Sequence, residues 1–423
     1  MFANRLPVKR TNPKTALAIS GASKSVFGGN LAEGRTSDST FIENGVLQTA
    51  AANVPVWENG GLRHEGADTN LIFRSEELDN AAYWQTASNV TVTANNVVGI
   101  FGNITAEKIT EVATTSTHRL SANNNSGIVI TNAVPVYITA FLKKGTRRYN
   151  ALSLTNNAGN HQVTQWIDLD NGILGSNSTI GAQIVRNSCT IQSLGNGYFK
   201  IVLAVTPTGI ASNLLYIILL LTNADNTVTY LGDIGEYGYA TGIECKSTLS
   251  SYIPTTTAAV TRATCALSIP LVLNTNFYQR SAILMRVRAK HASSATAKSW
   301  LTPSTTAEGL IDNGSGALTF KDSAANTATA DLTSWAADTV ILVSIVTDDI
   351  TGLMSLSASK DNGVTWVTST DTTFAGLTVG ANWLFFSANT QVFELLGFKV
   401  KKSNKGFAQM KSWAMSHALS ETQ

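Results

Sequence analysis

Short alternating runs separated by asparagine–glycine pairs are the feature that most restricts how this chain can fold. Such pairs stand at Asn44-Gly45, Asn59-Gly60, Asn171-Gly172 and Asn196-Gly197. Both residues of the pair readily take positive φ angles, which a two-residue type I′ hairpin turn requires. Turn signals recur about every ten residues and no convincing helical period comes between them, which is typical of an antiparallel β-sandwich.

The alternating runs fall into two series. The first begins near residue 40 and includes NVTVTAN and YITAFLKK, and the second begins near Gln279 with SAILMRVRAK. A chain of 423 residues is long enough for two or three domains, each with its own core. We therefore predict an all-β protein with two antiparallel β-sandwiches, which the resemblance described below implies to be of the jelly-roll type. The first spans residues 40–263 with leading hairpins, and a connection at 264–277 leads to the second at 278–404.

The two ends of the chain do not follow the strand pattern. Residues 1–39 have no sustained period, are rich in glycine and serine, and carry six basic residues against the acidic Glu33 and Asp38. They predict an extended arm, which is either a solvated tail or an anchor ordered on a partner. In residues 405–423 the apolar side chains Phe407, Met410, Trp413 and Ala414 recur at helical spacing. A helix this short is not stable alone, so we expect it to dock on something.

Composition excludes several classes of function. Charged residues make up 14% of the chain and the formal net charge is +2, too balanced for a nucleic-acid binder. The longest apolar run, LLYIILLL, is far shorter than the roughly 20 residues that span a bilayer, so we expect no membrane span. The first residues have no apolar core segment, and we expect synthesis in the cytoplasm without a secretory signal. The three cysteines have no CxxC spacing and are expected to be free, mostly buried thiols.

Residue types that carry catalysis or bind metals form no recognisable pattern. The five histidines have no HxH or HExxH spacing, which argues against a metal site. The carboxylate pairs Asp168 and Asp170, Asp233 and Glu236, and Asp348 and Asp349 are explained as turn acids. A glycosidase needs two carboxyls about 5–9.5 Å apart, which these pairs would meet only by accident. We therefore expect no enzyme activity, no metal and no cofactor.

One short motif predicts a local structure. SKDNGVTW has the S-x-D-x-G-x-T-W pattern of the sialidase Asp-box, which is a hairpin brace, and it occurs once here. Gly363 would supply the turn, Ser359 and Asp361 would stand at its start, and Asp361 would accept hydrogen bonds from turn amides. Trp366 would plug the sheet. We expect a structural role rather than a sialidase role.

Aromatic residues are the remaining candidates for ligand contact. Tyr237 and Tyr239 in GEYGYATG, together with Trp84 and Trp166, have rings that could stack on sugars. The alternative is that they fill the cores, because large aromatics dominate the interiors of sandwiches. We take Tyr237, Tyr239 and Trp84 as the candidate glycan-stacking residues.

Two strings mark the ends of the first series. The opening string contains Gly61, Leu62, Glu65, Thr69, Asn70, Leu71, Ser75 and Trp84. The closing string, SYIPTTTAAVTRA, contains Ser251, Tyr252, Ile253, Pro254, Thr255, Val260, Thr261 and Arg262. Together they resemble the strings that open and close a carbohydrate-binding-module-like jelly roll in bacteriophage virion proteins. The chain departs from that pattern before the closing string, where TGIECKSTLS keeps only the Gly242 and Glu244 positions.

The resemblance implies both a structure and a role. The closing string is expected to be a terminal strand and its lead-out, with Pro254 tolerated at a sheet edge. The second sandwich resembles the laminin-G and concanavalin-like domains of such proteins. The family comprises virion appendages, namely head fibres or spikes and tail fibres. Resemblance to a sugar-binding module does not establish sugar binding, because many such modules are spacers.

We therefore expect a structural virion protein, anchored to other capsid or tail proteins through its N-terminal arm. It is expected to form a homotrimer and to display its sandwiches toward host-surface glycans, without contact to nucleic acid. Two alternatives stay open: a capsid decoration protein without a ligand, and a glycan-degrading tailspike. The tailspike is the weaker alternative, because no repeat of a long β-helix is found in the sequence.

Overall fold

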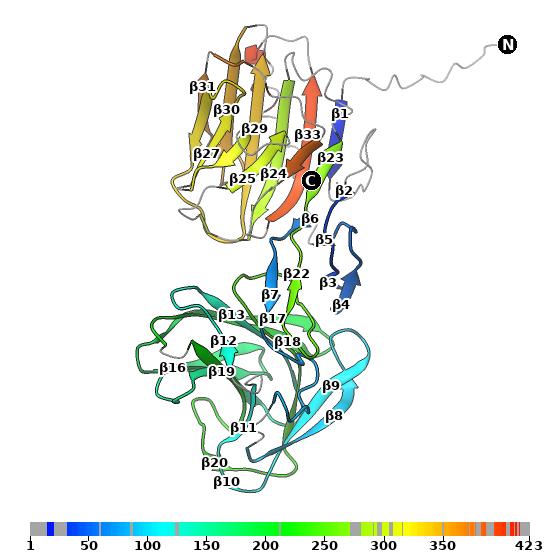
Figure 1. Cartoon of the computed structure of the whole chain (residues 1–423), viewed down its shortest axis with the longest axis vertical. Coiled ribbons are helices and arrows are strands. Elements are labelled where there is room, and N and C mark those ends of the chain that lie inside the picture. The colour runs from blue at the N-terminus through cyan, green and yellow to red at the C-terminus, as the bar shows by residue number, and fades with distance from the viewer. Residues whose placement is uncertain are drawn as a thin grey trace, which may run out of the picture. The chain divides into compact units, whose positions relative to one another are not determined.

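The computed structural model describes residues 15–20, 32–58, 61–84, 88–122, 127–210, 213–270, 281–290, 292–293, 298–303, 308–314, 316–348, 351–371, 373–375, 377, 382–385, 393–402, 407–409, 411–412 and 414. The all-β prediction is confirmed. Within these residues the regular structure is strand, apart from helical residues between 407 and 414 (Figure 1).

The chain divides into two compact units that are discontinuous in sequence. Unit 1 comprises Met1–Thr36, Ala52–Gly66 and Thr264–Gln423, and unit 2 comprises Ser37–Ala51 and Ala67–Ala263. The segment Ala52–Gly66 therefore differs from the expectation that placed it in the first sandwich. The reason is long-range strand pairing, which no local pattern in the sequence reveals.

Two antiparallel sheets form unit 1. The larger sheet follows the order β31 (Val367–Asp371), β30 (Leu353–Ser359), β29 (Thr339–Asp348), β24 (Ser281–Ala289), β33 (Phe393–Lys402), β6 (Gly61–His64) and β5 (Trp57–Glu58), with β1 (Thr15–Ser20) also paired to β33. The smaller sheet follows the order β2 (Ala32–Glu33), β23 (Leu267–Pro270), β32 (Asn382–Phe385), β25 (Lys298–Pro303), β26 (Gly309–Asp312), β27 (Ala317–Lys321) and β28 (Thr327–Asp331). Their inner faces enclose one apolar core, in which Trp300 packs edge-on against Trp335 at 6.0 Å.

Parts of the N-terminal region belong to these sheets. β1 pairs antiparallel with β33, and β2 pairs antiparallel with β23. Arg35 is fully buried and donates a hydrogen bond to the carbonyl oxygen of Val54 at 3.2 Å. This differs from the extended arm expected over residues 1–39, because two of its segments supply strands to unit 1. Residues 1–14 and 21–31 lie outside the described residues.

The C-terminal helical residues find their partner within the same chain. Ala414 is fully buried in a small cluster with Ala282, Leu284 and Val346 of the larger sheet, and Phe407 packs against this cluster. The helix was expected to need a docking surface, and this sheet provides one. It therefore gives no separate reason to expect a homotrimer.

Unit 2 is also built from two antiparallel sheets. The first, here called the β14 sheet, follows the order β11 (His118–Ala122), β19 (Leu214–Thr222), β14 (Tyr149–Asn156), β15 (Gln162–Asp168) and β16 (Ile173–Ile180), with β12 (Ile128–Val129) also paired to β19. The second, here called the β13 sheet, follows the order β17 (Ile184–Gly195), β18 (Tyr198–Pro207), β13 (Val136–Lys144), β21 (Tyr237–Lys246), β9 (Ile104–Glu111) and β8 (Val90–Val98). Three short pairs accompany them: β3 (Ser39–Glu43) with β4 (Val46–Ala50), β10 (Thr115–Ser116) with β20 (Tyr230–Leu231), and β7 (Asp68–Asn70) with β22 (Val260–Arg262).

The core of unit 2 follows from the two-residue period of its strands. Ile138 and Ala140 of β13 and Leu152 and Leu154 of β14 are fully buried in one cluster between the two sheets. Each large apolar side chain buried in this way contributes roughly 1.5–3 kcal/mol. The residues that alternate with them face away from this core. The outer faces of both sheets can therefore present polar and aromatic groups.

At Asn44-Gly45 and Asn196-Gly197 both residues take the positive φ angles that the sequence predicts, whereas at Asn171-Gly172 only the glycine does, with a φ of 63°. Asn44 and Gly45 have φ of 51° and 78°, and they join β3 to β4. Asn196 and Gly197 have φ of 50° and 78°, and they join β17 to β18. The pair Asn59-Gly60 lies outside the described residues.

The opening and closing strings of the resemblance meet in space. Asn70 donates a hydrogen bond from Nδ2 to the carbonyl oxygen of Ile253 at 2.8 Å. The amide of Thr255 donates to Ser75 Oγ at 2.9 Å, and the hydroxyls of Ser75 and Tyr252 lie 2.9 Å apart. These contacts explain why the two strings occur together: each supplies the hydrogen-bond partners of the other.

The closing string differs from the expected terminal strand at its start. Tyr252–Thr255 has no strand structure, and the strand begins only at β22, which pairs with β7. Tyr252 is buried and packs edge-on against Phe141 of β13 at 5.5 Å. The stretch is therefore held on the outer face of the β13 sheet by side-chain contacts rather than by a ladder of backbone hydrogen bonds.

A buried ion pair fixes this stretch. Glu244 and Lys246 of β21 are 0% and 1% exposed, and Lys246 Nζ lies 2.9 Å from Glu244 Oε1. The same Oε1 accepts a hydrogen bond from the amide of Ile253 at 2.7 Å. Lys246 Nζ also donates to the carbonyl oxygens of Ser250 and Ser251 at 3.0 and 2.6 Å. Burial raises the pKa of Glu244, and Lys246 opposes that shift.

Removing one member of this pair should destabilise unit 2. In Glu244→Ala, the Lys246 ammonium stays buried without its counter-charge and the Ile253 amide loses its acceptor, so we expect a loss of about 3–5 kcal/mol in the free energy of unfolding. Hydrogen exchange of β13 and β21 amides in the full chain would report on unit 2 alone. Glu43→Ala removes an exposed carboxylate of the same unit and serves as the control.

The double variant Glu244→Leu with Lys246→Met separates the charge effect from a packing effect. Replacing both charges by apolar groups is often neutral or stabilising, so this variant should recover most of the lost stability. Wild-type protection in Glu244→Ala would contradict the role assigned to the pair.

Candidate functional site

Two tryptophans considered for glycan stacking are part of the interior. Trp84 is 2% exposed, belongs to the core between the two sheets of unit 2, and donates from Nε1 to the carbonyl oxygen of Arg74 at 3.1 Å. Trp166 is 3% exposed and donates to the carbonyl oxygen of Thr227 at 3.2 Å. The expectation for Trp84 is therefore corrected: its ring stabilises the core and has no face free for a sugar.

Tyr237 and Tyr239 lie on the outer face of the β13 sheet. Ala240 of β21 is buried in the core, and the residues that alternate with it point outward. Across the ladder, Tyr239 lies opposite Lys143 of β13 on one side and Lys108 of β9 on the other. Residues directly opposite one another share a face of the sheet. Tyr237, Tyr239, Lys108 and Lys143, all half-buried, form what we call the tyrosine–lysine face.

The rings and ammonium groups of this face are in direct contact. The rings of Tyr237 and Tyr239 meet edge-on at 5.4 Å, with an interplanar angle of 75°. Lys108 Nζ lies 3.9 Å from the centre of the Tyr237 ring. Lys143 Nζ lies 5.2 Å from the ring of Tyr198, the buried residue opposite it on β18. Both distances are within the range of cation–π attraction.

The turn between β13 and β14 holds Tyr237 in position. The amides of Thr146 and Arg147 both donate to the carbonyl oxygen of Tyr237 at 3.0 Å, and the Tyr237 amide donates to Thr146 Oγ1. A Cβ at Gly145 would lie 2.3 Å from Cδ2 of the Tyr237 ring, so only glycine fits beneath it. The strands on either side of Gly145 belong to different sheets, which is why this turn crosses the edge of the sandwich.

An ion-pair network stabilises the edge beside this face. Arg147 donates to both oxygens of the buried Glu111 carboxylate at 2.7 Å, and the hydroxyl of Tyr230 donates to Glu111 Oε1 at 2.6 Å. The amide of Asp233 donates to Glu111 Oε2 at 3.0 Å. Burial, and after it the hydrogen bond to Glu111, raises the pKa of the Tyr230 phenol. Every oxygen of Glu111 is thus engaged in holding the fold.

The carboxylates considered as turn acids occupy turns in the structure. Asp168 accepts hydrogen bonds from the amides of Asp170 and Asn171 and a bidentate pair from Arg148, which lowers its pKa well below the usual range. Asp233 accepts from the amide of Gly235 at 2.8 Å. At Asp168 and Asp233 these contacts are those of acids that stabilise turns. Asp349 lies outside the described residues.

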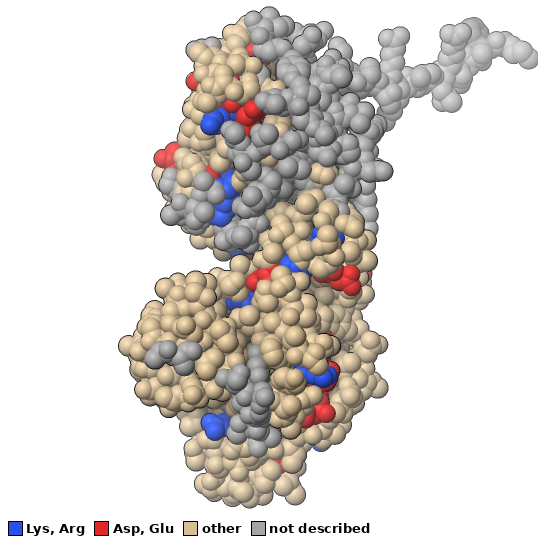
Figure 2. All heavy atoms as spheres, in the orientation of Figure 1, with Lys and Arg blue, Asp and Glu red and all other residues tan. Residues whose placement is uncertain are grey.

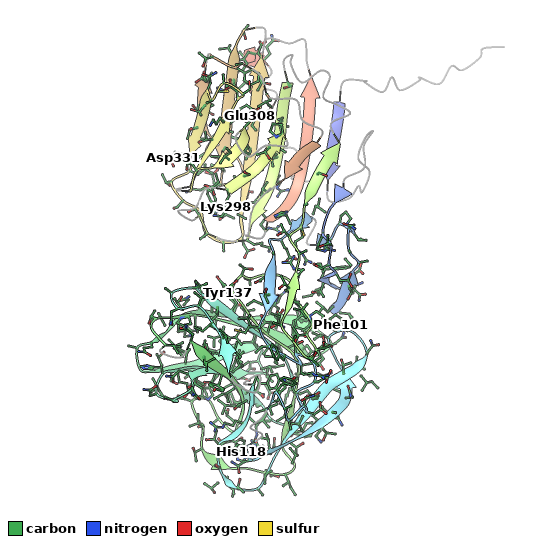
Figure 3. The ribbon with its side chains drawn as sticks, viewed as in Figure 1. Phe101, His118, Tyr137, Lys298, Glu308 and Asp331 are labelled. Carbon is green, nitrogen blue, oxygen red and sulfur yellow. The ribbon has the colours of Figure 1, made fainter. Side chains whose placement is uncertain are left out.

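The other half of the outer face is covered. Leu47 of the β3–β4 hairpin and Tyr252 of the closing stretch pack with Phe141, Leu194 and Tyr198 into a separate apolar cluster. Burial, and after it the neighbouring Tyr239, raises the pKa of the Tyr198 phenol. Figure 3 marks Phe101, which packs against this cluster, and His118 at the opposite end of unit 2. The tyrosine–lysine face borders this cluster, because Lys143 lies against the Tyr198 ring.

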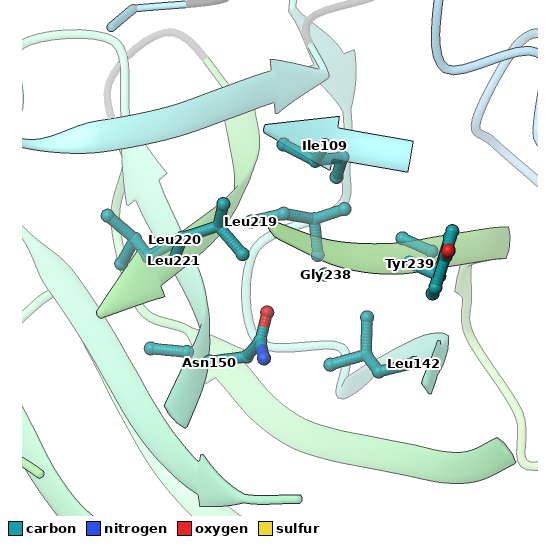
Figure 4. A pocket seen from close by; sticks show the side chains of 10 residues that line it. Ile109, Leu142, Asn150, Leu219, Leu220, Leu221, Gly238 and Tyr239 are labelled. Carbon is teal, nitrogen blue, oxygen red and sulfur yellow. The ribbon is translucent and has the colours of Figure 1, made fainter. Parts of the chain in front are cut away.

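A small cavity lies between the two sheets behind Tyr239. Its volume is about 10 Å³, room for about one water molecule. Leu142, Leu219 and Gly238 line it, and Asn150 contributes an amide group (Figure 4). Within the described residues the Nδ2 atom of Asn150 has no hydrogen-bond partner, which suits a bound water. The cavity is too small for a sugar.

Histidines and cysteines show no arrangement for catalysis or metal binding in the described part of the chain. His118 is buried against Tyr230, with its ring nitrogens 2.8 and 3.4 Å from the carbonyl oxygens of Asn89 and Tyr230. Among the described residues, no group of three histidine, cysteine, aspartate or glutamate side chains could hold a metal ion. Cys189, Cys245 and Cys265 are free thiols. None of the helical residues described forms a segment long and apolar enough to cross a membrane.

The Asp-box stretch has the contacts of a hairpin brace in unit 1. Asp361 Oδ1 accepts hydrogen bonds from Ser359 Oγ at 2.6 Å and from the amide of Thr365 at 2.9 Å, which lowers the pKa of Asp361 to about 2. The amide of Gly363 donates to Ser359 Oγ at 2.8 Å, and Gly363 has a φ of 81°. Trp366 packs against the cluster on the outer face of the larger sheet. These contacts join β30 to β31.

Comparison with known proteins leaves the family open. No family model matches the chain. No curated protein matches it either. Solved structures with some likeness include a botulinum neurotoxin serotype D binding domain (11% identity, 36% of this chain, 40% of that chain, TM-score 0.26). Another is the LG1-3 region of the laminin alpha2 chain (8% identity, 70% of this chain, 66% of that chain, TM-score 0.24). The chain thus spans less than half of the neurotoxin domain, and likenesses with TM-scores this low support neither a shared family nor a shared ligand.

Sequence reasoning found the two tyrosines but missed the lysines beside them. Lys108 and Lys143 are far apart in the chain, and only the strand register brings them to either side of Tyr239. The available signal was alternation. In YITAFLKKG the apolar residues Ile138, Ala140 and Leu142 predict an inward face, which places Lys143 on the same face as Phe141. The sequence does not show that β21 lies between β13 and β9, and so does not bring Lys143 and Lys108 to the same face.

Glu107 precedes Lys108 on β9 and points to the opposite side of the strand. It is 1% exposed, and its Oε2 accepts no hydrogen bond from the described residues. Burial raises the pKa of its carboxyl to about 9, and the nearby Asp79 adds to the shift. The side chain is therefore protonated in the folded protein at neutral pH.

This raised pKa predicts a pH dependence of stability. From pH 4.5, where the unfolded carboxyl ionises, to pH 9 the folded state binds more protons, so stability falls as pH rises. Glu107→Gln removes this penalty, and the variant should gain up to about 1.4 kcal/mol over the wild type for each pH unit above 5. Urea unfolding of both proteins at pH 5 and pH 8 measures the effect. Glu43→Gln is the exposed control, and a gain independent of pH would contradict the shift.

Proposed function

We propose that this protein is a non-enzymatic structural component of a bacteriophage virion that binds a glycan through the tyrosine–lysine face of unit 2. The observation that carries the glycan-binding part is the pair of half-buried rings, Tyr237 and Tyr239, on the uncovered half of the β13 sheet. Aromatic rings combine a large apolar surface with a polar tip, which suits them to stack on sugar rings.

Hydroxyl groups beside the rings support a sugar ligand. Thr110 of β9 lies opposite Tyr237, and Thr91 of β8 lies opposite Thr110, on the same face of the sheet. Thr93 lies opposite Lys108 and is exposed. Threonine hydroxyls both donate and accept hydrogen bonds, as the hydroxyls of a sugar do. A strip of rings, hydroxyls and ammonium groups is suited to adhesion.

The charged groups near this face support binding rather than cleavage. Glu111 is engaged with Arg147 and Tyr230, and Asp168 with Arg148. Glycoside hydrolysis needs one carboxyl that can donate a proton and a second one free to act on the sugar or on water. Carboxylates held in these ion pairs are poorly suited to either task, so we assign the protein no enzyme activity.

The virion role rests on the resemblance of the opening and closing strings to bacteriophage appendage proteins. In the structure Asn70 and Ser75 of the opening string form hydrogen bonds with the Tyr252–Thr255 stretch of the closing string. Low overall charge suits a displayed module, and the face of unit 2 visible in Figure 2 is mostly uncharged, with charged side chains in small groups. A homotrimer remains part of the proposal on the ground of the resemblance alone.

Removing either ring should weaken glycan binding without unfolding the protein. We expect Tyr239→Ala and Tyr237→Ala each to weaken binding to a glycan array or to host-cell polysaccharide about tenfold, because one stacking contact is lost. Tyr149→Ala, at a half-buried ring of the β14 sheet stacked by Arg148 at 4.7 Å, is the matched control. Wild-type protein that binds no glycan would favour the alternative of a decoration protein without a ligand.

The virion role is tested at the N-terminus. Because β1 and β2 belong to unit 1, the informative deletion removes only residues 1–14 and leaves both strands in place. We expect a folded protein that is absent from purified particles, measured by immunoblotting against the full-length chain. Assembly at normal copy number would place the anchor elsewhere in the chain. Absence of the full-length chain from particles would contradict the virion role itself.

A further inference from the structure

We propose that the glycan bound by the tyrosine–lysine face is anionic, with carboxylate-bearing sugars that meet Lys108 and Lys143. This inference rests on the proposed glycan binding and names the chemical class of the ligand. Its basis is the contrast between these two lysines and three neighbouring basic residues of unit 2, Lys144, Arg147 and Arg148.

Three neighbouring cations are paired with acids. Lys144 forms an ion pair with Asp170, Arg147 with Glu111, and Arg148 with Asp168. Within the part of the chain that the structure describes, neither Lys108 nor Lys143 has a carboxylate partner. Their ammonium groups lie instead against the rings of Tyr237 and Tyr198. In a chain with 30 basic and 28 acidic residues, two unpaired lysines on one face form a local positive site.

The contact with a ring leaves an ammonium group able to bind an anion. A lysine ammonium has three N–H donors and no acceptor. An aromatic face attracts the cation but satisfies its donors poorly, so donors remain for a ligand carboxylate. The ring also limits where the flexible side chain can lie, which reduces the entropy lost on binding. Lys108, held by the Tyr237 ring, is therefore preorganised to bind a sugar that carries a negative charge.

The spacing of the two lysines suggests how the ligand lies. Lys143 and Lys108 stand on strands separated by β21, so their backbones are two strand spacings apart, about 10 Å. Tyr239 stands between them in the same row. This distance is comparable to the length of a disaccharide. A chain with an acidic sugar at alternate positions would meet both lysines and place the intervening sugar on Tyr239.

The test uses matched probes that differ only in charge. These are sialyllactose and its carboxyl methyl ester, oligogalacturonate and its methyl ester, and hyaluronan oligosaccharides before and after carboxyl reduction. We expect the full-length protein to bind the acidic member of at least one pair about tenfold more tightly than the neutral member, because charge-assisted hydrogen bonds are the stronger ones. Raising the salt from about 0.05 to 0.5 M should weaken the acidic member only.

Variants assign the preference to the two lysines. The double variant Lys108→Gln with Lys143→Gln should lose the preference for the acidic member while it still binds the neutral one. Lys144→Gln, beside Lys143 but paired with Asp170, is the control and should keep the preference. Tyr239→Ala should weaken both members together. Thermal unfolding of each variant checks that unit 2 stays folded.

The outcomes separate this inference from the proposed function. Equal binding of acidic and neutral members, lost in Tyr239→Ala, would overturn the inference and leave glycan binding standing. Failure to bind any probe of the three pairs would overturn the inference for these acids, and the array result for host glycans would decide the proposed function. A poly-glutamate peptide that binds as tightly as the best acidic glycan would show that charge alone is recognised, which also overturns the inference.

Discussion

The buried carboxylate of Glu244 is the interaction on which the arrangement of unit 2 depends. It holds Lys246 in the interior and accepts a hydrogen bond from the amide of Ile253, so the closing stretch must lie on the outer face of the β13 sheet. That stretch brings Tyr252 onto Phe141 and covers one half of the face. The half that remains open is the tyrosine–lysine face. The Glu244–Lys246 ion pair therefore determines which part of this outer face is covered.

The two-residue period of the strands lets the same segments build the core and the candidate site. In β21, Ala240 fills the core while Tyr239 faces outward, and in β9 the buried Glu107 and the half-buried Lys108 lie on opposite sides of the sheet. A shift of register by one residue would exchange these positions and bury the lysine. The Gly145 turn beneath Tyr237 helps to fix the register at this edge, since no other residue fits there.

The sequence predicted what depends on neighbours along the chain and failed where distant segments meet. Alternation and asparagine–glycine turns predict the strands and the hairpin at Asn44-Gly45, because these need only local geometry. The pairing of β1 and β6 with β33 joins the two ends of the chain, and no period records it. The burial of Trp84 was not predicted either, because the sequence around a tryptophan does not show whether the indole fills a core or faces solvent.

Charge pairing separates the residues that hold the fold from those that are available to a ligand. Arg147 and Lys246 each neutralise a buried carboxylate, so their loss leaves an uncompensated charge in the interior. Lys108 and Lys143 neutralise nothing in the described part of the chain, and replacing them leaves no buried charge behind. The fold therefore does not require these two lysines, whereas a negatively charged ligand would. Residues of this kind are free to change with the ligand while the sandwich stays intact.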